Sequence, residues 1–104
     1  MQTNKSQIIS FLKDIKSELR DDGISTLGLF GSFARDEASV YSDIDIAIKK
    51  ESDYLRSRTA YDYFNEIEKI KNLIKSKFHR NSDILDLDSN SSMLDEIKKD
   101  LIYV

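Results

Sequence analysis

The chain has 104 residues, and its 16 lysines and arginines against 19 aspartates and glutamates give a formal net charge of −3. This length predicts a single domain over residues 1–104, and the acidic balance excludes a protein that holds nucleic acid by bulk charge, so we expect no stable nucleic-acid binding. The absence of cysteine excludes disulfide frameworks and cysteine-ligated zinc, and the absence of a membrane span or signal-peptide pattern predicts a cytoplasmic protein without membrane association.

The first half of the chain predicts a helix, a buried strand and a tight turn. Residues 4–21 carry apolar side chains at helical spacing with charged residues between them, which predicts an amphipathic helix. Gly23 follows as a left-handed cap. Residues 24–30 are mostly apolar and predict a buried strand, and residues 32–37 predict a short helix or turn.

The second half predicts two further strands and two further helices. Residues 43–48 alternate isoleucine with aspartate or alanine, as a half-buried strand does, and a polar connection follows them. The pattern then predicts a helix over 59–77, a strand over 83–87 and a closing helix over 92–101. The order α-β-β-α-β-α predicts an α/β fold in which helices pack against a small mixed sheet.

Gly31 and Ser32 stand where the first predicted strand turns into the next element. Glycine lets a ligand approach the backbone closely, serine adds a hydroxyl, and the start of a helix directs N–H groups outward. These are the properties of a phosphate-binding turn. An ordinary strand-to-helix turn uses the same residues, so this pair alone does not decide between the two interpretations.

Asp43 and Asp45 share one face of their predicted strand, since successive side chains of a strand alternate between its faces. The isoleucines on the other face account for the core, but repulsion between two neighbouring carboxylates is unfavourable. A divalent cation removes that repulsion, and hard oxygen ligands suit Mg²⁺. The alternative interpretation is a half-exposed strand with a polar outer face.

A third carboxylate would complete a two-metal site of the kind that clamps a phosphoryl transfer. The third predicted strand offers Asp83, Asp86 and Asp88. Periodicity does not choose among them, because each face of this strand mixes acidic and apolar residues. Asp83 stands at the start of its strand, as Asp43 and Asp45 do on theirs, so we expect Asp83 to be the third carboxylate.

The pattern Gly31-Ser32, ten residues, then Asp43-x-Asp45 resembles the signature of the nucleotidyltransferase superfamily that includes DNA polymerase beta. The longer stretch GSFARDEASVYSDID is similar to the minimal nucleotidyltransferases of the MntA antitoxin type, which are encoded beside HEPN-domain partners. The similarity covers most of the chain. It implies the polymerase beta-like nucleotidyltransferase fold.

The resemblance also implies roles for individual residues. It implies three catalytic metal ligands, namely Asp43, Asp45 and Asp83. It implies contacts to the nucleotide from Gly31, Ser32, Arg35 and Ser42. The family usually has an apolar residue before its third aspartate, whereas this chain has Ser82 there.

The function implied by the resemblance is a Mg²⁺-dependent nucleotidyltransferase, with two ions, that moves AMP from ATP. The acceptor would be a tyrosine of a HEPN ribonuclease toxin, so that the chain acts as an antitoxin and assembles with the toxin or with copies of itself. A non-catalytic antitoxin that blocks its partner by association alone is one alternative. A small-molecule nucleotidyltransferase that works as a homodimer is the other.

Overall fold

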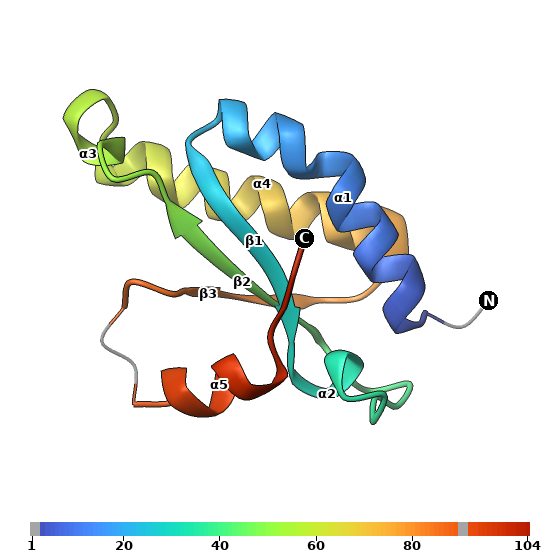
Figure 1. The fold of residues 1–104 in the computed structure, drawn as a ribbon. Helices are drawn as coiled ribbons and strands as arrows, with labels where there is room; N and C mark the ends of the chain where they lie inside the picture. Colours follow the sequence, from blue (N-terminus) through green and yellow to red (C-terminus); the bar gives the residue numbers. More distant parts are fainter. Residues whose placement is uncertain (1–2, 90–91) are drawn as a thin grey trace.

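A computed structural model describes residues 3–89 and 92–104. The elements follow one another along the chain as α1 (Lys5–Asp21), β1 (Ile24–Phe30), α2 (Gly31–Ala34), β2 (Ile44–Lys50), α3 (Tyr54–Ser57), α4 (Ala60–Phe78), β3 (Ser82–Asp86), α5 (Leu94–Asp100) and β4 (Ile102–Tyr103) (Figure 1).

The strands of the described residues form one mixed sheet in the order β3-β2-β1-β4. β1 is antiparallel to β2 and to β4, whereas β2 and β3 are parallel. The predicted α/β fold is confirmed. The predicted order lacks α2, α3 and β4, because α2 and α3 have four residues each and β4 has two, too few to leave a periodic pattern in the sequence.

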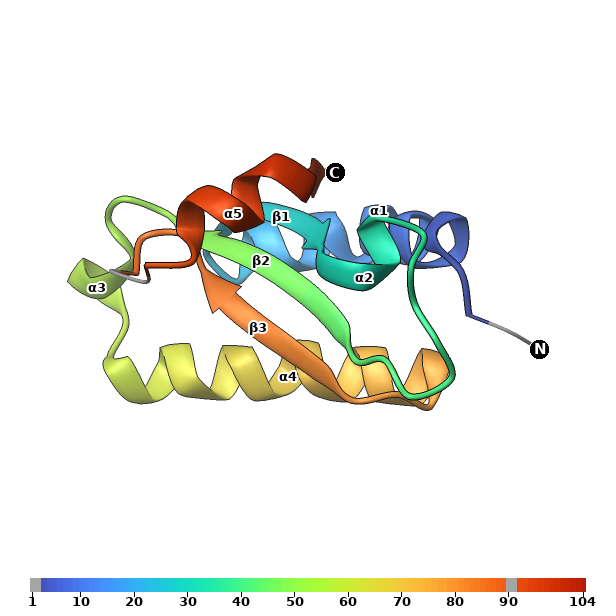
Figure 2. The same ribbon diagram turned by 90° about the horizontal axis from the view of Figure 1, so that it is seen from below.

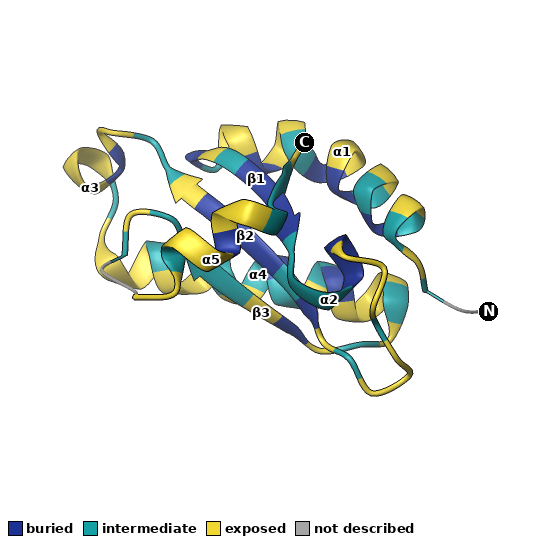
Figure 3. Ribbon diagram, turned by 60° about the horizontal axis from the view of Figure 1, so that its bottom comes forward, coloured by how far each residue is buried: buried dark blue, intermediate teal, exposed yellow. Residues whose placement is uncertain are grey.

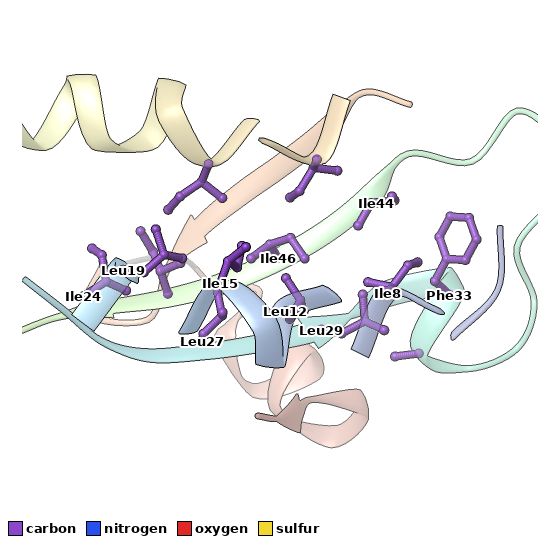
Figure 4. Packing of buried hydrophobic residues seen from close by; sticks show 14 residues of the cluster. Ile8, Leu12, Ile15, Leu19, Ile24, Leu27, Leu29, Phe33, Ile44 and Ile46 are labelled. Carbon is purple, nitrogen blue, oxygen red and sulfur yellow. The ribbon is translucent and has the colours of Figure 1, made fainter. Parts of the chain in front are cut away.

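The helices lie on both faces of this sheet. α1 and α4 cover one face, and the shorter α5 lies against the other (Figures 1 and 2). Alternation along β2 directs its isoleucines towards α1 and α4, and it directs Asp45 and Ala47 to the side of α5. The core between the sheet and α1 and α4 is mostly aliphatic, and its members include Ile8, Leu12, Ile15, Leu19, Leu27, Leu29, Ile44, Ile46, Ile48, Ile70 and Ile74 (Figure 4).

The two long helices expose one side to solvent and bury the other, as amphipathic helices do (Figure 3). Each begins with a capping box, in which the side chain of the N-cap residue and a side chain three residues later satisfy free backbone N–H groups. Asn4 and Gln7 form it at α1, and Thr59 and Asp62 form it at α4. No helix in the described part of the chain is long and apolar enough to cross a membrane.

β4 is an edge strand of the sheet and pairs with β1 where β1 has a glycine. It pairs with β1 through Gly28 opposite Tyr103 and Leu29 opposite Ile102. A Cβ atom on Gly28 would lie 2.9 Å from the carbonyl oxygen of Ile102 and 2.8 Å from the Leu101 side chain. Only glycine therefore lets the chain return this closely from α5.

Candidate active site

The parallel pairing of β2 with β3 aligns two of the predicted carboxylates. In this register Asp45 is paired with Asp83. Three residues further along both strands, Ile48 is paired with Asp86. Aligned residues on neighbouring strands about 4.8 Å apart point to the same face of a sheet. Asp83 therefore lies level with Asp45, as predicted, on the side of α5. Asp43 lies just before β2 and is exposed.

The surroundings of Asp45 disfavour the ionised form of its carboxyl group. Burial, and after it the negative charges of Asp83 and Asp43, together raise the pKa of its carboxyl to about 6. The positive charge of Arg35 acts in the opposite direction. Burial and the neighbouring carboxylates therefore make ionisation of Asp45 less favourable than that of an ordinary aspartate, and a cation placed among the carboxylates would remove their repulsion.

Gly31 makes room for the Asp45 carboxylate. Its φ angle is +76°, a conformation that side-chain-bearing residues rarely adopt, and a Cβ atom there would lie 2.0 Å from Asp45 Oδ2. The sequence explained this glycine by the close approach of a phosphate. The structure adds a second reason, because Gly31 and Asp45 are in contact across the β1–β2 pair.

A cleft of about 440 Å³ opens beside these residues, between the end of β1, the start of β3 and α5. Arg35 lines it, and the Arg35 guanidinium bonds to two carboxylates, with Nε 3.1 Å from Glu37 Oε2 and Nη1 2.8 Å from Asp100 Oδ2. The remaining lining residues are Phe30, Gly31, Asp45, Asp83, Ile84, Leu85, Met93, Glu96, Ile97 and Asp100. Sequence reasoning missed the contribution of α5, which lies far along the chain from the Gly-Ser and Asp-x-Asp motifs and has no signature of its own.

A family model described as "Polymerase beta, Nucleotidyltransferase" matches residues 13–104, nearly all of the chain. The chain belongs to this nucleotidyltransferase family. A protein of Methanocaldococcus jannaschii that carries the provisional name protein adenylyltransferase is 36% identical over 69 residues, which are 64% of this chain and 80% of that protein.

Solved structures have the same fold. One described provisionally as a minimal nucleotidyltransferase superposes with a TM-score of 0.71 at 20% identity, over 97% of this chain and 96% of that one. A toxin–antitoxin structure with AMP-PNP gives 0.59 at 23% identity, over 97% and 72% of the two chains. A variant of the toxin–antitoxin pair MntA–HpeT gives 0.57 at 23% identity, over 99% and 72%.

A nucleotidyltransferase of this family works on a nucleotide with a divalent metal. The donors of the cleft fit Mg²⁺, because Asp45 and Asp83 present hard carboxylate oxygens whose mutual repulsion a cation would relieve. Among residues 3–89 and 92–104, no three acidic, histidine or cysteine side chains converge as a complete metal-binding group. Mg²⁺ commonly takes one or two carboxylates and completes its shell with substrate phosphates and water.

Asp86 has a different role in this nucleotidyltransferase. It points to the side of α4, where its Oδ2 accepts a hydrogen bond of 2.6 Å from the Tyr63 hydroxyl. The same oxygen forms an ion pair with Lys50. The Asp88 N–H donates to Oδ1 at 2.8 Å. Burial alone would raise the pKa of Asp86, but these hydrogen bonds outweigh it and hold the pKa below its ordinary value. Asp86 therefore anchors α4 to β3, away from the cleft.

Ser42 lies in the loop that leads to Asp43. Its hydroxyl accepts a hydrogen bond of 2.9 Å from the Ser39 N–H, and Ser42 is not among the residues that line the cleft. Arg80 fixes the same loop, because its Nη1 lies 2.8 Å from the Ser42 carbonyl oxygen. The predicted contact between Ser42 and a nucleotide stays a prediction, as do the catalytic roles of the aspartates and the phosphate contacts of Gly31, Ser32 and Arg35.

Proposed function

We propose that this nucleotidyltransferase moves AMP from ATP onto a tyrosine hydroxyl of a partner protein, a HEPN-domain toxin, and so acts as its antitoxin in the cytoplasm. The observation that carries the proposal is the alignment of Asp45 with Asp83 beside Gly31, because it gathers acidic oxygens next to a turn that suits a phosphate. The name of the archaeal relative and the toxin–antitoxin neighbours support the kind of acceptor.

Mg²⁺ bound by Asp43, Asp45 and Asp83 would neutralise the triphosphate and stabilise departing pyrophosphate. The backbone N–H groups of Gly31 and Ser32, which start α2 and lack intrahelical acceptors, bind the phosphates. α2 has four residues, so these N–H groups matter more than a helix dipole. Arg35 adds a positive charge at the same cleft.

The transfer forms a bond between the tyrosine oxygen and the α-phosphorus and breaks the bond from that phosphorus to the bridging oxygen of pyrophosphate. Asp83, exposed at the rim of the cleft, takes the tyrosine proton. The AMP group adds a negative charge to the toxin, and a negative charge beside a ribonuclease site repels RNA.

A partner protein is the favoured acceptor because the described elements are all used to build the sheet and its covering helices. Within residues 3–89 and 92–104 no second lobe stands over the cleft to enclose a small acceptor. The acceptor surface therefore comes from another molecule.

The test is incubation of the purified protein with Mg²⁺, ATP labelled at the α-phosphate and the product of the neighbouring gene. Label on a tyrosine of that product is the expected result, and Asp45→Asn should abolish it while Asp88→Asn, which alters an exposed carboxylate, should not. Inhibition of the toxin without any label would overturn the proposal in favour of a binding antitoxin. Label on neither protein, with label on a small acceptor, would favour a small-molecule enzyme.

A further inference from the structure

We propose that Asp100, the last residue of α5, is a positioning residue that holds the Arg35 guanidinium towards the phosphates of a nucleotide bound in the cleft. The inference rests on the proposed function only in that a nucleotide occupies this cleft. It adds a residue from α5, outside the Gly-Ser and Asp-x-Asp motifs, to the binding of that nucleotide.

The contact between the two side chains is well formed and joins distant parts of the chain. Nη1 of Arg35 donates to Asp100 Oδ2 at 2.8 Å across 65 residues of sequence, and Nε donates to Glu37 Oε2 at 3.1 Å. A guanidinium has five N–H donors in a rigid plane. These two bonds therefore fix the plane, and Nη2, which has no hydrogen-bond partner among the described residues, remains for a ligand.

The charges of the cleft explain why a fixed guanidinium matters. Arg35 is the one cationic side chain among the described residues that line the cleft, where Asp45, Asp83, Glu96 and Asp100 are acidic. A triphosphate entering this cleft meets strong repulsion that Arg35 and a metal must offset. A free arginine side chain loses about 2 kcal/mol of rotamer entropy when it is immobilised. Because Asp100 already restrains Arg35, less of that cost remains when the nucleotide binds.

The local structure of α5 does not account for Asp100. A negative charge in the last turn of a helix interacts unfavourably with the carbonyl groups that end there. α5 is attached to the sheet by Ile97, its one buried residue. The side chain of Asp100 is only 28% exposed, less than that of Arg35 at 42%, so the acidic partner lies on the inner side of the pair.

The experiment measures the affinity of Mg²⁺–AMP-PNP by calorimetry for the wild type, Arg35→Ala, Asp100→Ala and the double variant. We expect Arg35→Ala to weaken binding most, because it removes the phosphate contact itself. Asp100→Ala should weaken binding by a smaller factor, about fivefold. The double variant should bind like Arg35→Ala, because Asp100 acts through Arg35.

Two further variants separate positioning from general stability. Asp100→Glu should restore most of the affinity, and Asp95→Ala, which removes an exposed charge from the same helix, should leave affinity unchanged. Equal losses in Arg35→Ala and Asp100→Ala, with equal falls in melting temperature, would mean that the pair only fastens α5 and would overturn the inference. Tighter binding by Asp100→Ala would overturn it too, since Asp100 would then compete with phosphate for Arg35. A wild type that binds no nucleotide would instead overturn the proposed function, and this inference with it.

Discussion

At the scale of the residue, Asp45 shows the conflict between function and stability. It is half-buried beside two other carboxylates, and its pKa is raised to about 6, first by burial and then by the charges of Asp83 and Asp43. An aspartate with a raised pKa stabilises the fold while it is protonated and loses that contribution as the pH rises towards the raised value. The site therefore holds an ionised group that the fold alone disfavours.

Asp45→Asn should abolish nucleotidyl transfer and leave the apo protein at least as stable as the wild type. The substitution removes the repulsion among the carboxylates but also removes a proposed metal ligand. The melting temperature at pH 7.5 should stay level or rise, and Mg²⁺–ATP should no longer raise it. Asp88→Asn is the control with the same loss of charge. Transfer at the wild-type rate by Asp45→Asn would contradict the assignment.

Gly31→Ala should damage both the fold and the site. The methyl group would lie 2.0 Å from Asp45 Oδ2, and the φ angle of +76° is itself unfavourable for alanine. We expect a loss of about 1–3 kcal/mol in the free energy of unfolding, together with weakened nucleotide binding. Ser32→Ala keeps the backbone N–H groups and should weaken transfer only moderately. Unchanged ATP affinity in a folded Gly31→Ala protein would place the nucleotide elsewhere.

At the scale of the element, the register of β2 and β3 decides which aspartates share the cleft. Parallel pairing aligns Asp83 with Asp45, whereas Asp86 lies three residues further along the strand and is bound on the side of α4. The two residues differ by three positions in sequence. They belong to opposite faces of one strand.

Asp83→Asn and Asp86→Asn should therefore have opposite effects. Asp83→Asn should keep much of the Mg²⁺–ATP affinity, through Asp43 and Asp45, but lose most of the transfer rate. Asp86→Asn should keep transfer in the folded fraction, and it should lower the free energy of unfolding by about 1–3 kcal/mol because Lys50 loses its charged partner. Urea unfolding and single-turnover transfer rates measure the two effects, and a reversal of the two phenotypes would contradict the assignment.

The long helices and β2 could be predicted because each carries a period that one buried face imposes, and β1 could be predicted because it is a short apolar run. The strand over residues 24–30 was placed with its observed bounds, and the alternation of Asp45 with isoleucines predicted the face that it occupies. The contact of Gly31 with Asp45 could not be predicted, since it depends on strand register and a left-handed backbone angle. Asp100 could not be predicted either, because only the packing of α5 brings it to Arg35.

At the scale of the whole molecule, the packing of α1 against α4 encloses a second strained acid. Glu66 on α4 is 9% exposed, and its Oε1 has no hydrogen-bond partner among the residues that the structure describes. Burial raises the pKa of Glu66 to about 7, and a hydrogen bond with Asp22 at the end of α1 contributes. The positive charge of Lys69 lowers the pKa of Glu66. Lys69 Nζ itself donates a hydrogen bond of 2.6 Å to Asp22 Oδ2.

Stability should consequently fall as the pH rises from about 4.5 to 7. In that window the folded protein holds a proton on Glu66 that the unfolded chain has released, so each rise in pH favours unfolding. Glu66→Gln should flatten this dependence and stabilise the protein by about 1–3 kcal/mol at pH 8. Urea unfolding across the pH range measures it. The control is Glu68→Gln, an exposed acid on the same helix, and an equal gain there would attribute the effect to net charge.

The two walls of the cleft are fastened to the molecule very differently, and this sets which of them can move. β2, which holds Asp45, is hydrogen-bonded on both sides, to β1 and to β3. α5 forms the opposite wall, and it is followed by a strand that pairs with β1 at two positions. Native-state hydrogen exchange should therefore show the amides of residues 44–48 exchanging only through global unfolding, while those of α5 exchange through a far cheaper local opening. We therefore expect α5, and not the wall that holds the carboxylates, to be the part of the cleft that moves.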